Sequence, residues 1–215
     1  MSVKVVEAED VDMNRIFELT ARAFARNEPV WDVMYPQHWR DSGRKVGGER
    51  FRAIKNADPQ TTFLKAVDPL TGEIMGMAKW NVYDNQLPDP ANQPPTGDYW
   101  ENDDKKAYAS EIIQIFTRDR DAAIKASDGN LVSLEILTVD PAFQRRGVGA
   151  ALVAWGTKIA DELGVDTVVE SSVFGKGLYL KNGFQFVKDV TVSPPEKWAG
   201  RPEGSFAWLV RPKRQ

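Results

Sequence analysis

Residues 131–153 read LVSLEILTVDPAFQRRGVGAALV. An apolar run ends at Asp140, and an amphipathic pattern begins around Gly147 and Gly149. These features predict a β-strand that leads through a glycine-bearing turn into an α-helix. We expect the rest of the fold to be arranged around this strand, turn and helix.

The turn is suited to anion binding, because the first N–H groups of a helix lack intrahelical partners and lie at the positive end of its dipole. Gly147 and Gly149 would let the backbone approach a pyrophosphate, and Arg145 and Arg146 add positive charge. A glycine pair is also typical of an ordinary turn, and the arginines are equally compatible with a solvent-facing position. The P-loop ending and the three-glycine dinucleotide fingerprint are absent, which weakens the case for ATP hydrolysis or NAD chemistry.

Gln144, Gly147 and Gly149 resemble the signature of the GNAT superfamily of acyl-CoA-dependent N-acetyltransferases. That signature is Gln or Arg, two residues, Gly, one residue, and Gly or Ala. Downstream, residues 178–184 (LYLKNGF) resemble the tyrosine and Gly-Phe ending of the family's last helix. The resemblance extends over most of the chain, and residues 170–179 look most like a fungal-type branch.

The resemblance implies a mixed α/β fold with a splayed central sheet of about seven strands and helices on both faces. It also implies acetyl-CoA as the acyl donor, with the main chain of Leu137, Thr138 and Val139 paired to the pantetheine arm. Ser172 stands where many members have an asparagine that contacts this arm. The phosphate turn that the resemblance implies comprises Gln144, Arg145, Arg146, Gly147, Val148, Gly149 and Ala150.

Three residues are candidates for the catalytic chemistry. Tyr179 matches the family's tyrosine near the CoA sulfur, which implies proton return to the departing thiolate, although ring packing would also explain a tyrosine here. Glu135 and Glu170 are candidate general bases, because a carboxylate amid apolar strand residues needs either a salt bridge or a position that faces the site. Two-residue alternation predicts that Glu135 shares a strand face with Leu137 and Val139.

Composition narrows the class of protein. The 215 residues fit one domain spanning 1–215, with a probable insertion at 84–127. A net charge of −3 gives no support for a nucleic acid partner. No apolar stretch approaches the roughly 20 residues that span a bilayer, so we expect no membrane partner and a cytoplasmic location, or a nuclear one. The absence of cysteine excludes an acyl-cysteine intermediate, and the single histidine, His38, is expected to be structural or solvent-facing.

Hydrophobic periodicity predicts the remaining elements. Strands are expected at 3–6, 61–67, 73–83, 131–139, 166–171, 184–192 and 205–210. Helices are expected at 16–24, 43–56, 105–126, 152–163 and 178–180. Residues 29–39, 84–104 and 194–202 are expected to be connections, and the alternating charges late in 105–126 are expected to face solvent.

We therefore expect an N-acetyltransferase that transfers the acetyl group of acetyl-CoA to a primary amine by direct attack in a ternary complex. Two alternatives are a non-catalytic acyl-CoA-binding regulatory module and an acetyltransferase of protein lysines or N-termini. The acceptor is a small-molecule amine or a peptide, and the protein is a monomer or a homodimer, with an exposed Trp198 favouring the dimer. Seven aromatic residues are candidates to line the acceptor pocket, although packing would explain each: Trp31, Tyr35, Trp39, Trp80, Tyr83, Tyr99 and Trp100.

Overall fold

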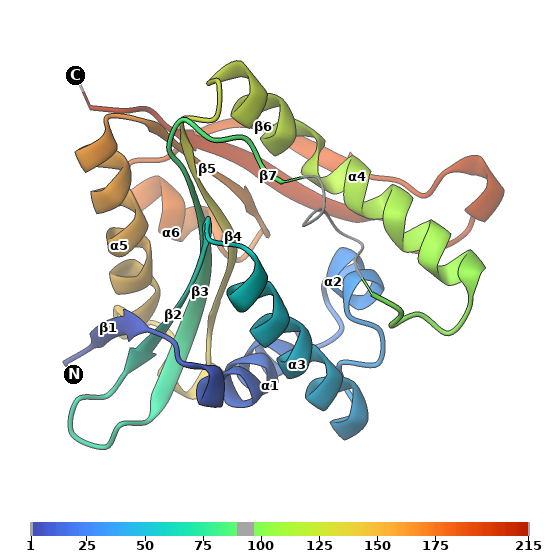
Figure 1. The fold of residues 1–215 in the computed structure, drawn as a ribbon, viewed down its shortest axis with the longest axis horizontal. Helices are drawn as coiled ribbons and strands as arrows, with labels where there is room; N and C mark the ends of the chain where they lie inside the picture. Colours follow the sequence, from blue (N-terminus) through green and yellow to red (C-terminus); the bar gives the residue numbers. More distant parts are fainter. Residues whose placement is uncertain (1, 90–96, 215) are drawn as a thin grey trace.

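The computed structural model describes residues 2–89 and 97–214, which form a seven-stranded sheet flanked by helices (Figure 1). The strand order is β1-β2-β3-β4-β5-β7-β6. The strands are β1 (Lys4–Glu7), β2 (Thr61–Val67), β3 (Ile74–Tyr83), β4 (Leu131–Val139), β5 (Asp166–Ser171), β6 (Gln185–Val192) and β7 (Gly204–Arg211). The α-helices are α1 (Met13–Phe24), α2 (Pro29–Met34), α3 (Asp41–Ala57), α4 (Asp103–Ala126), α5 (Val148–Leu163) and α6 (Lys176–Lys181). The predicted α/β fold, with a mixed sheet and helices on both faces, is confirmed.

The two faces of the sheet are covered by different helices (Figure 1). Neighbouring strands are antiparallel except β4 and β5, which are parallel and are connected by α5. Because side chains alternate along a strand, neighbouring residues pack on opposite faces of the sheet. Val132 and Leu209 pack between the sheet and α5, in what we call the α5 core, whereas Leu131 and Trp208 pack between the sheet and α4, in the α4 core. The helices α1 and α3 lie on the same face of the sheet as α4. They pack over the other half of that face and enclose a third core. The α4 face is therefore shared by two groups of helices.

The segment 29–39 contains a helix that the sequence interpretation missed. Pro29 occupies the first position of α2, which suits proline because the N–H it lacks would have no helical partner there. Trp31 of α2 packs against Phe17 in the third core. His38 is buried and its Nε2 lies 2.7 Å from Oδ1 of Asp32, a structural contact of the kind expected.

One prediction for α4 was wrong. The alternating charges of its later turns were expected to face solvent, but Arg120 is 6% exposed. It falls on the same helical stripe as Phe116 and Ile124, at spacings of four residues. The guanidinium of Arg120 is therefore buried, because it lies on the apolar face of α4.

The prediction of an exposed Trp198 was also wrong. This side chain lies in a short 3₁₀ turn, Glu196–Trp198, and is 7% exposed. Its Nε1 donates a hydrogen bond of 2.9 Å to Asp104 at the start of α4. Trp198 therefore fastens the connection between β6 and β7 to α4, and it gives no support to a dimer surface.

The predicted connection 84–104 is only partly described, because residues 90–96 lie outside the described residues. Its last residues begin α4, and Trp100 is buried, with Nε1 donating a hydrogen bond of 2.9 Å to the carbonyl of Val33. The assignment of 84–127 as an insertion in a single domain stays a prediction. Among the helices of the described ranges, none combines the length and the apolar character needed to cross a bilayer.

Candidate active site

The pairing of β4 with β5 stops before either strand ends. The last paired residues are Leu134 and Val169, yet β4 runs on to Val139 and β5 to Ser171. Within residues 2–89 and 97–214, no strand pairs with this edge of β4 beyond Leu134. The strands therefore diverge and leave main-chain N–H and C=O groups of β4 open to a ligand.

The turn after β4 presents the start of α5 at this opening. Gly147 caps the helix with φ of +87°, a left-handed conformation that favours glycine, and open space surrounds the position where a side chain would stand. The first N–H groups of α5 point out of the helix without intrahelical partners. Arg145 and Arg146 are exposed, and neither forms an ion pair within the part of the chain that the structure describes.

Contacts around the turn fix its position. The side-chain amide of Gln144 donates a hydrogen bond of 3.3 Å to the carbonyl of Val139, which holds the turn against the end of β4. A side chain at Gly149 would come 3.0 Å from Cδ2 of Leu178, so the absence of one lets α6 pack against the start of α5. The glycine pair therefore serves two purposes, an open cap at Gly147 and close packing at Gly149.

The side chains at the end of β4 are engaged in the fold. The hydroxyl of Thr138 lies 3.1 Å from that of Thr20, which itself donates to the carbonyl of Ile16 at 2.9 Å. Leu137 and Val139 pack toward the α5 core. The main chain of these three β4 residues is therefore what faces the opening between the strands.

A β-bulge reverses the direction of Glu135. The register of β3 and β4 shifts by one residue at this point, so Glu135 is the extra residue. Its carboxylate contacts Lys79 and Arg120 on the α4 face, whereas Leu137 and Val139 face α5. The prediction that Glu135 shares a face with them was wrong, because strict alternation fails at a bulge.

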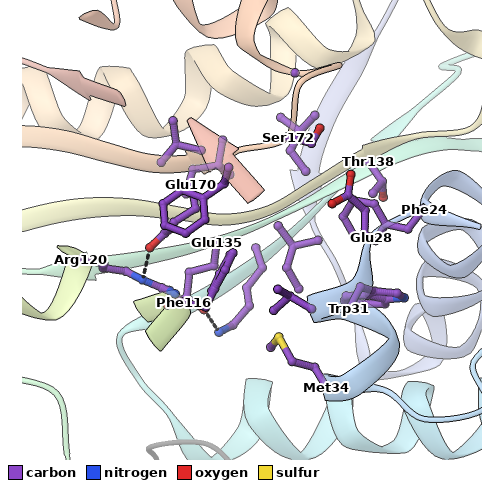
Figure 2. A pocket seen from close by; sticks show the side chains of 18 of the residues that line it. Phe24, Glu28, Trp31, Met34, Phe116, Arg120, Glu135, Thr138, Glu170 and Ser172 are labelled. Atoms are coloured by element: carbon purple, nitrogen blue, oxygen red, sulfur yellow. Dashed lines mark hydrogen bonds and ion pairs between the residues drawn. The ribbon is translucent and has the colours of Figure 1, made fainter. Parts of the chain in front are cut away.

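Arg120 joins the two candidate carboxylates (Figure 2). It forms an ion pair with Glu135, and its Nε lies 3.0 Å from Oε1 of Glu170, close enough for an ion pair but outside hydrogen-bond geometry. Lys79 forms a second ion pair with Glu135. The side chains of Arg120 and Glu170 are 8% and 1% exposed, so these charges interact in a largely dry interior.

The two carboxylates have opposite pKa shifts. Burial raises the pKa of Glu135, but attraction to Arg120 and Lys79 outweighs burial and brings the pKa to about 2. Burial raises the pKa of Glu170 to about 7, and Arg120 only partly opposes this rise. Glu135 is therefore a firmly ionised carboxylate that holds two cations, which makes it a poor proton acceptor near neutral pH.

A cavity of about 1230 Å³ connects these features. We call its two parts the β4 half and the α2 half. The β4 half is lined by Leu137, Thr138, Val139, Gln144, Arg145, Gly147, Gly149, Ala150, Ser172 and Tyr179. The α2 half is lined by Glu28, Trp31, Met34, Tyr35, Arg50, Lys79, Tyr83, Tyr99, Phe116, Arg120, Glu135 and Glu170. Of the site residues named from the sequence, only Arg146 and Val148 do not line the cavity.

Tyr179 and Ser172 lie where β5 leads into α6. Tyr179 is 5% exposed, and its ring packs edge-on against Phe184 at 5.6 Å. Burial, and then the charge of Glu170, raise the pKa of the Tyr179 phenol, so it stays protonated at neutral pH. The hydroxyls of Tyr179 and Ser172 make no hydrogen bond within the described residues, and both groups border the cavity.

Glu28 is a functional candidate that the sequence interpretation missed. It is the N-cap residue of α2, but its side chain makes no capping hydrogen bond and points into the cavity toward the part lined by Thr138 and Ser172 (Figure 2). Its carboxylate forms no hydrogen bond or ion pair within residues 2–89 and 97–214. Burial alone raises its pKa. An unpaired carboxylate with a raised pKa at a cavity wall is suited to accept a proton.

The predicted aromatic lining is partly confirmed. Trp31, Tyr35, Tyr83 and Tyr99 line the cavity. Trp80 packs in the α5 core instead, against Gly156, while Trp39 and Trp100 do not line the cavity. Four of the seven aromatic residues thus form an apolar wall of the α2 half.

Comparisons with known proteins agree with this geometry. Residues 98–186, from before α4 to the start of β6, match the family model described as Acetyltransferase (GNAT) domain. No curated protein matches the chain in sequence. The predicted GNAT fold is confirmed, since solved acetyltransferase structures share it over nearly the whole chain.

Three of these solved structures illustrate the likeness. A histone acetyltransferase HPA2 and related acetyltransferase from Corynebacterium glutamicum is 19% identical with a TM-score of 0.64, covering 100% of this chain and 98% of that one. An arylalkylamine N-acetyltransferase like 5b from mosquito is 14% identical with a TM-score of 0.63, covering 97% and 99%. A phosphinothricin acetyltransferase from Sinorhizobium meliloti, solved in complex with AcCoA, is 15% identical with a TM-score of 0.58, covering 99% and 89%. At these identities, the comparison shows a common fold.

The Arg120 ion pairs predict a large effect on stability. Arg120→Met removes the cation, leaves the buried Glu170 without its partner and leaves the partly buried Glu135 with Lys79 alone, which should lower the free energy of unfolding by about 3–5 kcal/mol. Arg118→Met, an exposed change two residues away on the same helix, should alter it by at most about 0.5 kcal/mol. Urea unfolding of both variants measures the difference. Equal losses in the two variants would contradict the proposed contribution of Arg120.

Proposed function

We propose that the protein is an N-acetyltransferase that moves the acetyl group of acetyl-CoA to a primary amine by direct attack in a ternary complex. One observation carries this proposal: a single cavity joins the open edge of β4 and the start of α5 to an unpaired carboxylate, Glu28. An acyl donor fits the β4 half, and an amine fits the α2 half. The family model and the fold of the three acetyltransferases support the donor assignment.

The β4 half would hold acetyl-CoA mainly through backbone groups. The N–H groups from Val148 to Ala150 would bind the pyrophosphate, with Arg145 and Arg146 adding charge at the rim. The main chain of residues 137–139 would pair with the pantetheine arm, and one N–H would polarise the thioester carbonyl. Ser172, whose hydroxyl is otherwise without a partner, would donate or accept a hydrogen bond to the same arm.

The reaction then needs two protons to leave the ammonium nitrogen, one before and one after the attack, and one proton to reach sulfur. Glu28 would take a proton from the ammonium, and the neutral nitrogen would attack the thioester carbon, forming a C–N bond as the C–S bond breaks. Tyr179, protonated at neutral pH, would donate its hydroxyl proton toward the departing thiolate. The nitrogen loses its second proton after the attack, and Glu28 and Tyr179 return to their starting protonation states by exchange with water, so the products are the N-acetylamine, CoA thiol and one proton.

Glu28 is a better general base than the two carboxylates named from the sequence. Glu135 is neutralised by two cations, and its pKa of about 2 leaves it a weak acceptor. Glu170 has a pKa of about 7, but it is paired with Arg120 and its side chain is only 1% exposed. We therefore assign Glu135 and Glu170 to positioning the strands and retain Glu28 for proton transfer.

The acceptor class and the subfamily are part of the same proposal. The aromatic wall of the α2 half favours a small amine over a folded protein surface, because it is enclosed by α2, α3 and α4. Arylalkylamine and phosphinothricin acetyltransferases among the structural neighbours act on small amines of this kind by name. The likeness of residues 170–179 to a fungal-type branch rests on sequence alone.

The donor site is tested by calorimetric titration with acetyl-CoA. Gly147→Ala forces an alanine into a left-handed conformation at the α5 cap and should weaken acetyl-CoA binding by about tenfold or more. Gly164→Ala makes the same kind of change at the other end of α5, where φ is +67°. It should lower the stability of the fold by a similar amount but leave acetyl-CoA binding unchanged.

Turnover is then followed as free thiol released over polyamines, arylalkylamines, amino acids and lysine peptides. Thiol release that depends on a small amine supports the proposal. Binding without release from any amine would favour the regulatory module, and release from lysine peptides alone would favour a protein acetyltransferase. No binding of acetyl-CoA would contradict the site assignment.

The role of Glu28 predicts a change in the pH profile. A base works only when deprotonated, so wild-type kcat/KM should fall as pH drops through the raised pKa of Glu28. Glu28→Gln should lose this acidic limb and about 10²- to 10⁴-fold in kcat. Glu18→Gln, on the outer surface of α1, is the matched control. An unchanged acidic limb in Glu28→Gln would rule out Glu28 as the base.

If Tyr179 donates the proton to sulfur, loss of its hydroxyl should slow the chemical step without weakening acetyl-CoA binding. Tyr179→Phe keeps the ring packed on Phe184 and removes only the hydroxyl, so acetyl-CoA affinity should stay constant while kcat falls by about 10²-fold. Tyr108→Phe removes a phenol hydroxyl outside the cavity and should leave kcat unchanged. Steady-state kinetics beside calorimetry separates the two quantities, and a Tyr179→Phe variant with normal kcat would disprove the assignment.

A further inference from the structure

Arg50 is a buried cation in the α2 half that the proposed reaction does not use. It extends from α3, is 8% exposed and lines the cavity. Within the described residues it forms no ion pair, whereas the neighbouring cations Lys79 and Arg120 are both paired with carboxylates. Buried charges in proteins are normally paired, so an unpaired guanidinium at a cavity wall needs a partner.

The protein satisfies only part of the Arg50 guanidinium. Nη1 donates a hydrogen bond of 2.6 Å to the carbonyl of Met34, the last residue of α2. The rings of Tyr35 and Tyr99 lie 4.2 and 4.4 Å from its central carbon. These two rings pack on the guanidinium, and its other N–H groups have no hydrogen-bond partner within the described residues. The edge is the part of an arginine that binds a carboxylate with two parallel hydrogen bonds.

The helix α2 separates this cation from the proposed base. Glu28 lies at its start and Met34 at its end, with Trp31 between them along the cavity wall (Figure 2). Six residues of α-helix rise about 9 Å. This rise gives the length of α2, and a molecule that extends along the whole helix is longer than an α-amino acid.

We infer that the acceptor carries an anionic group as well as its amine: a primary amine whose chain is long enough to extend along α2 to a carboxylate, which Arg50 binds while the amine lies at Glu28. This inference rests on the proposed acetyl transfer and names its substrate class. The apolar side chains between the two ends, Trp31 and Phe116 among them, would contact the connecting chain. Arg50 is then a specificity-determining residue, distinct from the groups that perform the chemistry.

The test compares straight-chain ω-amino acids with their carboxamides as acceptors, from 3-aminopropanoate to 8-aminooctanoate, with CoA thiol release as the readout. An acid and its amide differ little in size, so the ratio of their kcat/KM values isolates the charge. For chains of about six to eight carbons we expect the wild type to prefer the acid by about ten- to a hundredfold, the effect of a hydrogen bond to a charged group. The shortest acids, which cannot span α2, should show no such preference.

Variants at Arg50 test whether this residue recognises the carboxylate of the acceptor. Arg50→Met should remove the preference by lowering kcat/KM for the long acids while leaving that for their amides within about twofold. Arg50→Lys keeps a charge but loses the two-pronged geometry, so it should retain only part of the preference. Lys45→Met, which removes an exposed charge from the same helix, is the control and should keep the wild-type ratio.

Each outcome decides between the proposals. Equal use of acids and amides by the wild type, or use of simple amines alone, would overturn the anionic acceptor and leave acetyl transfer standing. A parallel loss for acids and amides in Arg50→Met would assign Arg50 a structural role instead. Absence of thiol release with every amine, despite acetyl-CoA binding, would remove the proposed function itself and this inference with it.

Discussion

The site depends on the contact of one guanidinium with two strands at the place where their pairing stops. Glu135 is the first β4 residue beyond the last paired position, and Glu170 is the first in β5. Arg120 from α4 lies between their carboxylates, so it connects the strands where backbone hydrogen bonds no longer do. Beyond this contact the strands diverge, and the open edge of β4 forms one side of the cavity.

The ion pairs of Arg120 also decide which carboxylates are free to accept a proton. Because Glu135 holds Arg120 and Lys79, it is unavailable as a base, although its position on β4 made it a reasonable candidate. Two charged groups of the α2 half have no ion pair within the described residues: Glu28 at the start of α2 and Arg50 against its last carbonyl. Opposite charges at the two ends would orient an acceptor that carries both an amine and an acid.

Local patterns predicted most of the fold and most of the residues that line the β4 half of the cavity. The run 131–153 combines a strand, a glycine-bearing turn and a helix within one stretch, so its structure follows from neighbouring residues. The misses depend on distant contacts. Glu28 carries no motif, and its burial arises only when α1, α2 and the end of β4 come together. Arg120 did carry a signal, because it falls on the apolar stripe of α4, and two buried carboxylates required a cation.

The central claim is that the diverging edge of β4 and the start of α5 bind an acyl-CoA together. Hydrogen–deuterium exchange of the backbone amides, with and without acetyl-CoA, measures this directly. Addition of acetyl-CoA should slow exchange at residues 137–139 and 148–150 and should leave it unchanged at residues 131–134, which are already paired with β5. Protection elsewhere in the chain, with the first two segments unaffected, would contradict the claim.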